Sequence, residues 1–217
     1  MIVVIQCAAS KDRDAGYFAA PDGRSIIFVA DPELAPEDSS YIYARPDDHI
    51  NDDATWRELV LSYNKTNSNP QGLFPAYRLY KNLAYGRLVD RFGLKNVYIL
   101  SAGSGLIRAS FLTPYYDITF SKASNVEPYK RGGKADHYED FCMLPNDLDE
   151  PITFFGGKDY IPLFCTLTES AKGLRTVFYN SARPPDTPGC TLERFDTTTR
   201  TNWHYECANQ FLNQRNS

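Results

Sequence analysis

Two short runs of β-branched and aliphatic residues, at positions 2–5 (Ile-Val-Val-Ile) and 97–100 (Val-Tyr-Ile-Leu), each end abruptly at a polar segment. Continuous apolar runs of this length are typical of strands that are buried on both faces of a parallel sheet. Residues 151–155 and 174–179 have the same character and predict two more strands. Because ligands of open α/β sheets bind beyond the carboxyl ends of the strands, the polar segments predict where a site lies.

Helical patterns occupy much of the chain between these runs. We predict helices at residues 53–63, with Asp53 or Thr55 as N-cap, at 79–92, with Gly93 as the stop, at 161–172 and at 199–213. Alternating strands and helices predict an α/β fold. We therefore expect a single domain over residues 1–217, built as a three-layer sandwich around a mostly parallel central sheet of four or five strands.

The region between the first strand and the first helix has a different composition. Residues 25–30 predict a further strand, whereas residues 31–53 are rich in proline and acidic side chains and cannot propagate a helix. We expect residues 31–53 to form an irregular acidic excursion over the surface.

The charge of the chain argues two ways about its partners. The net charge of −4 by itself disfavours a nucleic-acid partner, but residues 78–134 contain ten Lys or Arg and only three acidic residues. A local basic surface can attract a polyanion on an acidic protein, because steering depends on the local field. A solvated helix face would give the same pattern.

Several classes of protein do not fit the sequence. No run approaches the roughly 18 apolar residues that span a bilayer, and the first residues lack the form of a signal peptide. We therefore expect a cytoplasmic protein with no membrane partner. The five cysteines form no Cys-x-x-Cys pair and the three histidines are scattered, so we expect neither a disulfide framework nor a metal site.

Three polar segments follow predicted strands. They are residues 6–11 (Gln-Cys-Ala-Ala-Ser-Lys), residues 101–107 (Ser-Ala-Gly-Ser-Gly-Leu-Ile) with a Tyr-Tyr-Asp sequence at 115–117, and residues 156–160 (Gly-Gly-Lys-Asp-Tyr). Their glycines would let backbone amides approach a ligand closely. Neither glycine pair matches a Walker or a dinucleotide-binding motif.

Together with a Pro-Ala-x-x-Leu-Tyr helix start at residues 75–80, these segments resemble a family of small bacterial proteins. That family is related to the YaaA-like peroxide-stress proteins and to the core domain of archaeosine synthase, within the uracil-DNA-glycosylase-like fold. The resemblance covers residues 1–12 and 74–162, whereas residues 31–53 and those after Gly173 depart from the pattern.

The resemblance implies action on modified nucleobases or on DNA. Antiphage DNA glycosylases that remove glucosylated hydroxymethylcytosine from phage DNA belong to the wider group and have a similar size. The chain would then be a DNA glycosylase that hydrolyses the N-glycosidic bond of a modified base, leaves an abasic site and needs no cofactor.

Two residues are candidates for the chemistry. We expect Asp117 to stabilise a cation-like sugar and to orient water; its alternative role is a structural cap. We expect Lys11 either to contact a phosphate or base carbonyl as a cation or to attack the sugar as an amine; otherwise it is a surface lysine.

The remaining candidates would bind the nucleotide. The expected base- and sugar-binding residues are Cys7, Ser101, Ser104, Gly105, Tyr116, Tyr77, Tyr80, Gly157, Lys158 and Tyr160. The expected contacts to the DNA backbone are Arg108, Lys122, Lys130, Arg131 and Lys134. Aromatic rings can stack on an extruded base and cations can hold phosphates without reading sequence, whereas Cys7 is better suited to packing than to nucleophilic attack.

Two other functions stay open. The acidic net charge favours a nucleoside or nucleotide hydrolase, or a base transferase, acting on small molecules. A non-catalytic DNA-binding stress protein is the third possibility.

Overall fold

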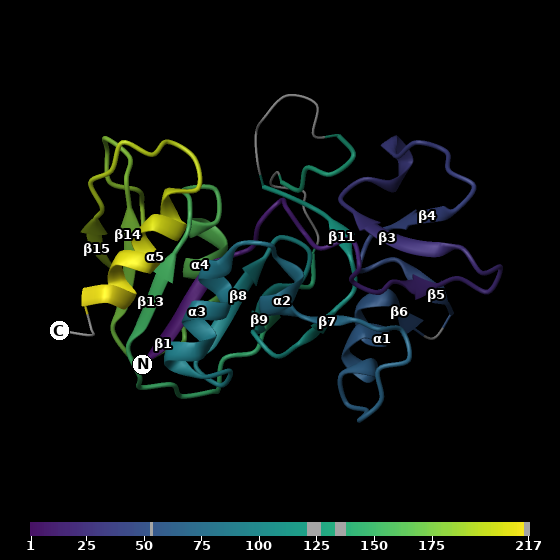
Figure 1. The fold of residues 1–217 in the computed structure, drawn as a ribbon, viewed down its shortest axis with the longest axis horizontal. Coiled ribbons are helices and arrows are strands. Elements are labelled where there is room, and N and C mark those ends of the chain that lie inside the picture. Colours follow the sequence, from purple (N-terminus) through teal and green to yellow (C-terminus); the bar gives the residue numbers. More distant parts are fainter. Residues whose placement is uncertain (53, 121–126, 133–137, 215–217) are drawn as a thin grey trace.

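The computed structural model describes residues 1–52, 54–120, 127–132 and 138–214. Within these residues the central sheet has seven strands in the order β12-β9-β8-β1-β13-β14-β15 (Figure 1). The strands are β1 (Ile2–Gln6), β8 (Val97–Ser101), β9 (Gly105–Arg108), β12 (Phe141–Cys142), β13 (Ile152–Phe155), β14 (Arg175–Tyr179) and β15 (Thr191–Arg194). β8, β1, β13, β14 and β15 are mutually parallel. The expected α/β class with a mostly parallel sheet is confirmed.

The expectation of four or five central strands is wrong, because three strands lack a long apolar run. β9 pairs antiparallel with β8 through a tight turn at residues 102–104, so the glycine-rich segment forms a hairpin. β12 is two residues long and pairs with β9. β15 is an edge strand with largely exposed side chains, and such strands carry charge rather than a buried pattern.

Helices cover both faces of the sheet. Phe154 stacks on Phe164 of α4 (Ile161–Leu167) with ring centroids 4.5 Å apart, whereas its neighbour Phe155 packs on Phe211 of α5 (Trp203–Gln214) at 5.2 Å. Consecutive residues of a strand point to opposite faces, so α4 and α5 lie on opposite sides of β13. Figure 1 shows α3 (Leu83–Phe92) beside α5, and the Arg87 guanidinium donates to Asn209 between the two helices.

The helix predicted at residues 79–92 begins four residues later, at Leu83, and Leu79 instead ends a separate short helix. Tyr80 is extended (φ −99°, ψ 133°), which ends α2 (Ala76–Leu79), and Asn82 then caps α3 by accepting from the Ala84 amide at 2.9 Å. Gly93 ends α3 as predicted, with φ 79°. α4 ends at Leu167, five residues before the predicted end at residue 172. At this observed end, the Thr168 hydroxyl donates to the Phe164 carbonyl.

A second sheet, of four strands among the described residues, forms a separate lobe on the right of Figure 1. Its strands are β2 (Phe18–Ala19), β3 (Ser25–Val29), β4 (Tyr41–Ala44) and β11 (Tyr116–Asp117). The lobe also contains α1 (Trp56–Tyr63), which is capped by Thr55, one of the two predicted N-caps; the other, Asp53, lies outside the described residues. The Thr55 hydroxyl accepts from the Glu58 amide at 3.2 Å, and the Glu58 carboxylate accepts from the Thr55 amide at 2.8 Å.

The stretch at residues 31–53 is more ordered than expected. It contains a 3-10 helix (Pro32–Leu34), β4 and β5 (His49–Asn51), which pairs with β6 (Ala54–Thr55). Pro36 and Pro46 stand on either side of β4 instead of interrupting it, so proline content did not exclude a strand. The remaining small pair joins β7 (Phe74–Pro75) to β10 (Leu112–Thr113). None of the described helices is both long enough and apolar enough to cross a bilayer.

Candidate active site

The topology places a site at the carboxyl end of β1. The chain runs from β1 to β8 on one side and later to β13 on the other, and such a reversal opens a crevice beyond the strand ends. Here the Gly157 amide donates to Gln6 Oε1 at 2.5 Å, and Cys7 Sγ lies 3.2 Å from the Tyr160 hydroxyl. Two of the predicted polar segments, at residues 6–11 and 156–160, therefore meet.

A buried hydroxyl network joins the third segment to them. The Ser101 hydroxyl donates to the Tyr116 hydroxyl at 2.9 Å, and the Tyr80 hydroxyl lies 2.7 Å from the same oxygen. Ser101 Oγ also accepts from the amides of Gly103 and Ser104. Burial raises the pKa of Tyr80 and of Tyr116 well above the usual value, so both remain neutral and act as a rigid scaffold.

Lys11 lies against this scaffold. Its side chain is only 5% exposed, and Nζ is 4.3 Å from the centroid of the Tyr116 ring. Among the described residues, Nζ has no hydrogen-bond acceptor and no carboxylate partner. Burial lowers the pKa of Lys11, and the nearby Cys7 and Asp117 partly oppose that shift. The alternative of a solvated surface lysine is therefore wrong.

Asp117 lies next to Tyr116 on β11 and is half-buried. Its carboxylate accepts no hydrogen bond and forms no ion pair within the described part of the chain. Burial raises the pKa of Asp117, and Lys11 partly offsets the rise. An aspartate that capped a helix or turn would accept a backbone N–H, so the structural alternative does not fit this geometry.

These two side chains are near enough to interact electrostatically but do not form an ion pair with each other. An isolated charge that is removed from water without a partner is unfavourable. Neighbouring charged groups whose pKa values are shifted by burial, as here, are more frequent at functional sites than elsewhere.

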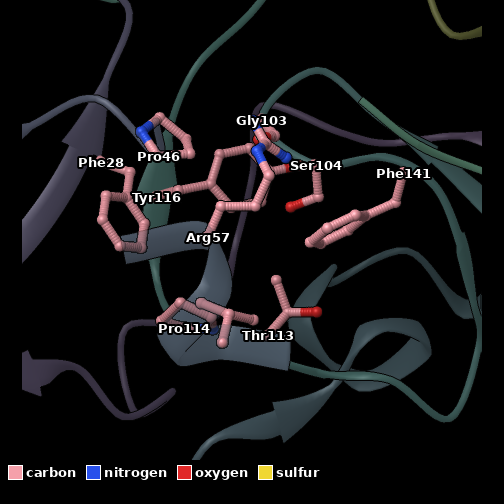
Figure 2. Close-up of a pocket in the computed structure, with 10 residues that line it drawn as sticks. Phe28, Pro46, Arg57, Gly103, Ser104, Thr113, Pro114, Tyr116 and Phe141 are labelled. Carbon is pink, nitrogen blue, oxygen red and sulfur yellow. The ribbon is translucent and has the colours of Figure 1, made fainter. Parts of the chain in front are cut away.

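A small pocket lies near the same tyrosine, between the central sheet and the lobe (Figure 2). Its walls are Phe28, Pro46, Arg57, Val60, Gly103, Ser104, Thr113, Pro114, Tyr116 and Phe141. Register pairs Tyr116 with Phe28, so these two side chains share one face of the second sheet and Asp117 points to the other. The Ser104 hydroxyl, an expected base contact, points into this pocket in Figure 2.

Arg57 occupies much of that pocket. Its guanidinium forms an ion pair with Asp47, donates to the Gly103 carbonyl at 3.4 Å and lies 5.0 Å from the Phe141 ring centroid. The space left is about 20 Å³, which holds about one water molecule. The pocket therefore does not admit a nucleobase in this conformation.

Gly105, another expected base contact, has a structural role. Its φ is +84°, and a Cβ added there would lie 2.5 Å from the Phe141 carbonyl oxygen. Gly105 thus lets β9 approach β12 closely at the start of the hairpin's second strand.

Replacing this glycine tests that role. Gly105→Ala should lower the free energy of unfolding by about 2–4 kcal/mol, through left-handed strain and a backbone clash. Chemical denaturation measures the change. Gly86→Ala is the matched control, since Gly86 lies within α3 with open space around it and alanine favours helix. Equal stability of Gly105→Ala and the wild type would contradict this role.

The expected DNA-backbone cations that the structure describes, Arg108, Lys130 and Arg131, do not form one surface. Arg108 is exposed but pairs with Tyr98 near the amino end of β8, so the antiparallel turn carries it away from the site. Arg131 is buried, forms a two-pronged ion pair with Asp140 and donates to the Ala102 carbonyl at 2.9 Å. It is therefore a structural cation rather than a free phosphate contact.

The other expected contacts are placed as follows. Lys130 is half-buried and bridges to Thr119, on the chain that continues β11. Lys122 and Lys134 lie outside the described residues. Lys158 is exposed beyond the end of β13. Tyr77 is half-buried on α2 and forms no hydrogen bond or ring contact with the Lys11–Asp117 site among the described residues.

The structure adds residues that we did not predict as site residues. Tyr17, Tyr41 and Tyr43 gather near Asp117 together with Tyr115. The alternating Tyr-Ile-Tyr-Ala sequence of β4 was the available signal, and the surrounding prolines obscured it. Arg57 and Phe141 carried no signal, because only the tertiary fold brings them together.

No family model, curated protein or solved structure matches the chain. Among the described residues, no group of three His, Cys, Asp or Glu side chains is arranged to hold a metal ion. The function must therefore be argued from the Lys11–Asp117 site itself.

Proposed function

We propose that this protein hydrolyses the N-glycosidic bond of a modified base in DNA, with Lys11 and Asp117 as the catalytic pair. The observation that carries the proposal is that these two charges interact electrostatically while neither has a hydrogen-bond or ion-pair partner among the described residues. Cleavage of a glycosidic bond separates charge, because the sugar becomes cation-like while the leaving base gains negative charge. A fixed anion and a fixed cation on either side of that bond match the separation.

The residues take complementary roles. Asp117 stabilises the cation-like sugar and orients the attacking water, and Lys11 stabilises the negative charge on the leaving base. Lys11 is held by burial against the Tyr116 ring, so little reorganisation of this cation is needed during the reaction. The partial removal of both groups from water increases the effect of each charge.

The fold gives supporting argument. The sequence resemblance implies a uracil-DNA-glycosylase-like fold. The mostly parallel central sheet, with helices on both faces and the site beyond the carboxyl ends of β1, β8 and β13, is compatible with that fold. The same resemblance supports glucosylated hydroxymethylcytosine in phage DNA as the substrate, met in the cytoplasm.

A second candidate function has one observation in its favour. Among the described residues the expected backbone cations are dispersed, with Arg108 away from the site and Arg131 neutralised by Asp140. A hydrolase of free nucleosides would need no phosphate-binding surface, so this arrangement favours it over a polymer-specific enzyme.

One experiment separates these functions. Purified protein is incubated without added metal with glucosylated phage DNA, with unmodified DNA and with the corresponding free nucleosides. Released bases are measured by mass spectrometry, abasic sites in DNA by alkaline cleavage, and DNA binding by a gel-shift assay. We expect abasic sites in the glucosylated DNA alone. Cleavage of nucleosides but not of DNA would support the small-molecule hydrolase, and DNA binding without any cleavage would support the non-catalytic protein.

A further inference from the structure

The outer face of the second sheet carries a group of tyrosines around Asp117. Parallel register pairs Asp117 with Val29, and Ile27 of the same strand with Tyr43. Alternation along each strand then places Asp117, Tyr43 and Tyr41 on one face. All three side chains are partly exposed.

Two further tyrosines join this face from neighbouring segments. The Tyr17 ring lies 5.3 Å from that of Tyr115 and 6.1 Å from that of Tyr41, measured between centroids. Tyr17 and Tyr115 are both half-buried. We call Tyr17, Tyr41, Tyr43 and Tyr115 the tyrosine face.

Charge near the tyrosine face is mixed. Burial raises the pKa of Tyr17 and of Tyr115, and the exposed Arg13 guanidinium partly lowers both. The pKa of Tyr43 is raised, mainly by burial and in part by the nearby Asp38 carboxylate. Arg13 can meet a phosphate, but the described residues do not make this face a basic surface of the kind that grips a duplex backbone.

We infer that the tyrosine face binds single-stranded DNA next to the reacting nucleotide, by stacking bases on its rings. Stacking on aromatic side chains tolerates any base, because every base has a π-face. A duplex keeps its bases stacked internally and offers mainly phosphates, for which the described part of this face has few cations. The inference rests on the proposed function, since Asp117 marks the reacting position.

Binding of unmodified oligonucleotides by wild-type protein tests this directly, with fluorescence anisotropy as the readout. A single strand should bind at least about tenfold more tightly than a strand of equal length and charge in which abasic spacers replace the bases. It should also bind more tightly than the duplex. Equal affinity for the base-containing and abasic strands would overturn the inference.

Variants then locate the interaction. Tyr41→Leu and Tyr43→Leu should each weaken single-strand binding about tenfold, whereas Tyr41→Phe and Tyr43→Phe keep the ring and should bind like the wild type. Tyr179→Leu is the matched control, because Tyr179 is half-buried on β14 in the central sheet. Circular dichroism confirms that each variant folds. Unchanged affinity in both Leu variants would overturn the inference.

The binding experiment is independent of the proposed reaction. Single-strand preference without any base release would remove the proposed function and keep the tyrosine face as a binding surface. Base release with equal binding of single strand, abasic strand and duplex would keep the function and overturn the inference.

Discussion

Asp117→Asn should lower the single-turnover rate of base release by about 10²–10³-fold or more, the range seen when a fixed electrostatic group is removed from an active site. The amide has nearly the same shape as the carboxylate but cannot neutralise a cation-like sugar. Rapid-quench measurement of abasic sites in glucosylated DNA checks the rate. Binding of the uncleaved DNA should change little, because the tyrosine face is intact.

The same variant should be at least as stable as the wild type at neutral pH. Burial raises the folded-state pKa of Asp117 above 3.8, so the folded chain binds a proton more tightly than the unfolded chain does. Stability from this group is therefore lost as pH rises from 3.8 through the raised pKa. The gain in stability of Asp117→Asn over the wild type should be full at neutral pH. It should disappear as pH falls through the raised pKa of Asp117 toward 3.8.

Asp140→Asn is the contrasting control. Asp140 pairs with the buried Arg131, and removing one partner of a buried ion pair lowers stability by about 3–5 kcal/mol. Urea denaturation of both variants distinguishes a functional from a structural aspartate. Loss of stability in Asp117→Asn similar to that in Asp140→Asn, or full activity, would contradict the role proposed for Asp117.

Lys11→Met should also lower the rate of base release, by about 10²-fold, because the leaving base loses a fixed cation. Methionine fills a similar apolar volume beneath Tyr116, so the fold should be as stable or more stable. The folded-state pKa of Lys11 is lowered below 10.5, so the unfolded chain binds its proton more tightly. The stability deficit of the wild type relative to Lys11→Met is therefore largest at neutral pH and shrinks as pH rises toward 10.5.

The pH dependence of the rate gives a further readout of the pair. The proposed reaction needs Asp117 ionised and Lys11 protonated, so a plot of the rate against pH should be bell-shaped. Because the pKa of Asp117 is raised and that of Lys11 is lowered, the bell should be narrower than the ordinary pKa values of 3.8 and 10.5 would give. Lys11→Arg keeps a cation that does not titrate, and it should retain part of the rate while its alkaline limb moves to higher pH. Covalent trapping of wild-type protein on DNA by borohydride would contradict this role and make Lys11 an amine nucleophile.

The sequence predicted the central strands well because their burial on both faces leaves an unbroken apolar run. It failed where pairing depends on turns, since Gly103 and Gly105 suggest a ligand loop as readily as the hairpin that starts β9. It also failed at Tyr41–Ala44, whose strand is specified by pairing with β3. Prolines at the two ends of a segment say little about its middle.

Of the candidate site, the sequence indicated Lys11 and Asp117 but not the feature that matters most. Whether a charge has a partner is decided by tertiary contacts: Arg131 has Asp140, whereas the described residues offer none to Lys11. Arg108 was likewise predicted to contact the DNA backbone, but the antiparallel strand carries it to Tyr98, away from the site.

The most direct test of the account is the binding of a DNA strand in which a pyrrolidine cation replaces one sugar as a mimic of the cation-like transition state. The neutral tetrahydrofuran analogue in the same strand is the reference, and neither requires knowing the base modification. The account predicts that wild-type protein prefers the cation by about 10²-fold or more and that Asp117→Asn loses this preference. Equal affinity of the wild type for both strands would contradict glycosidic bond cleavage at Asp117.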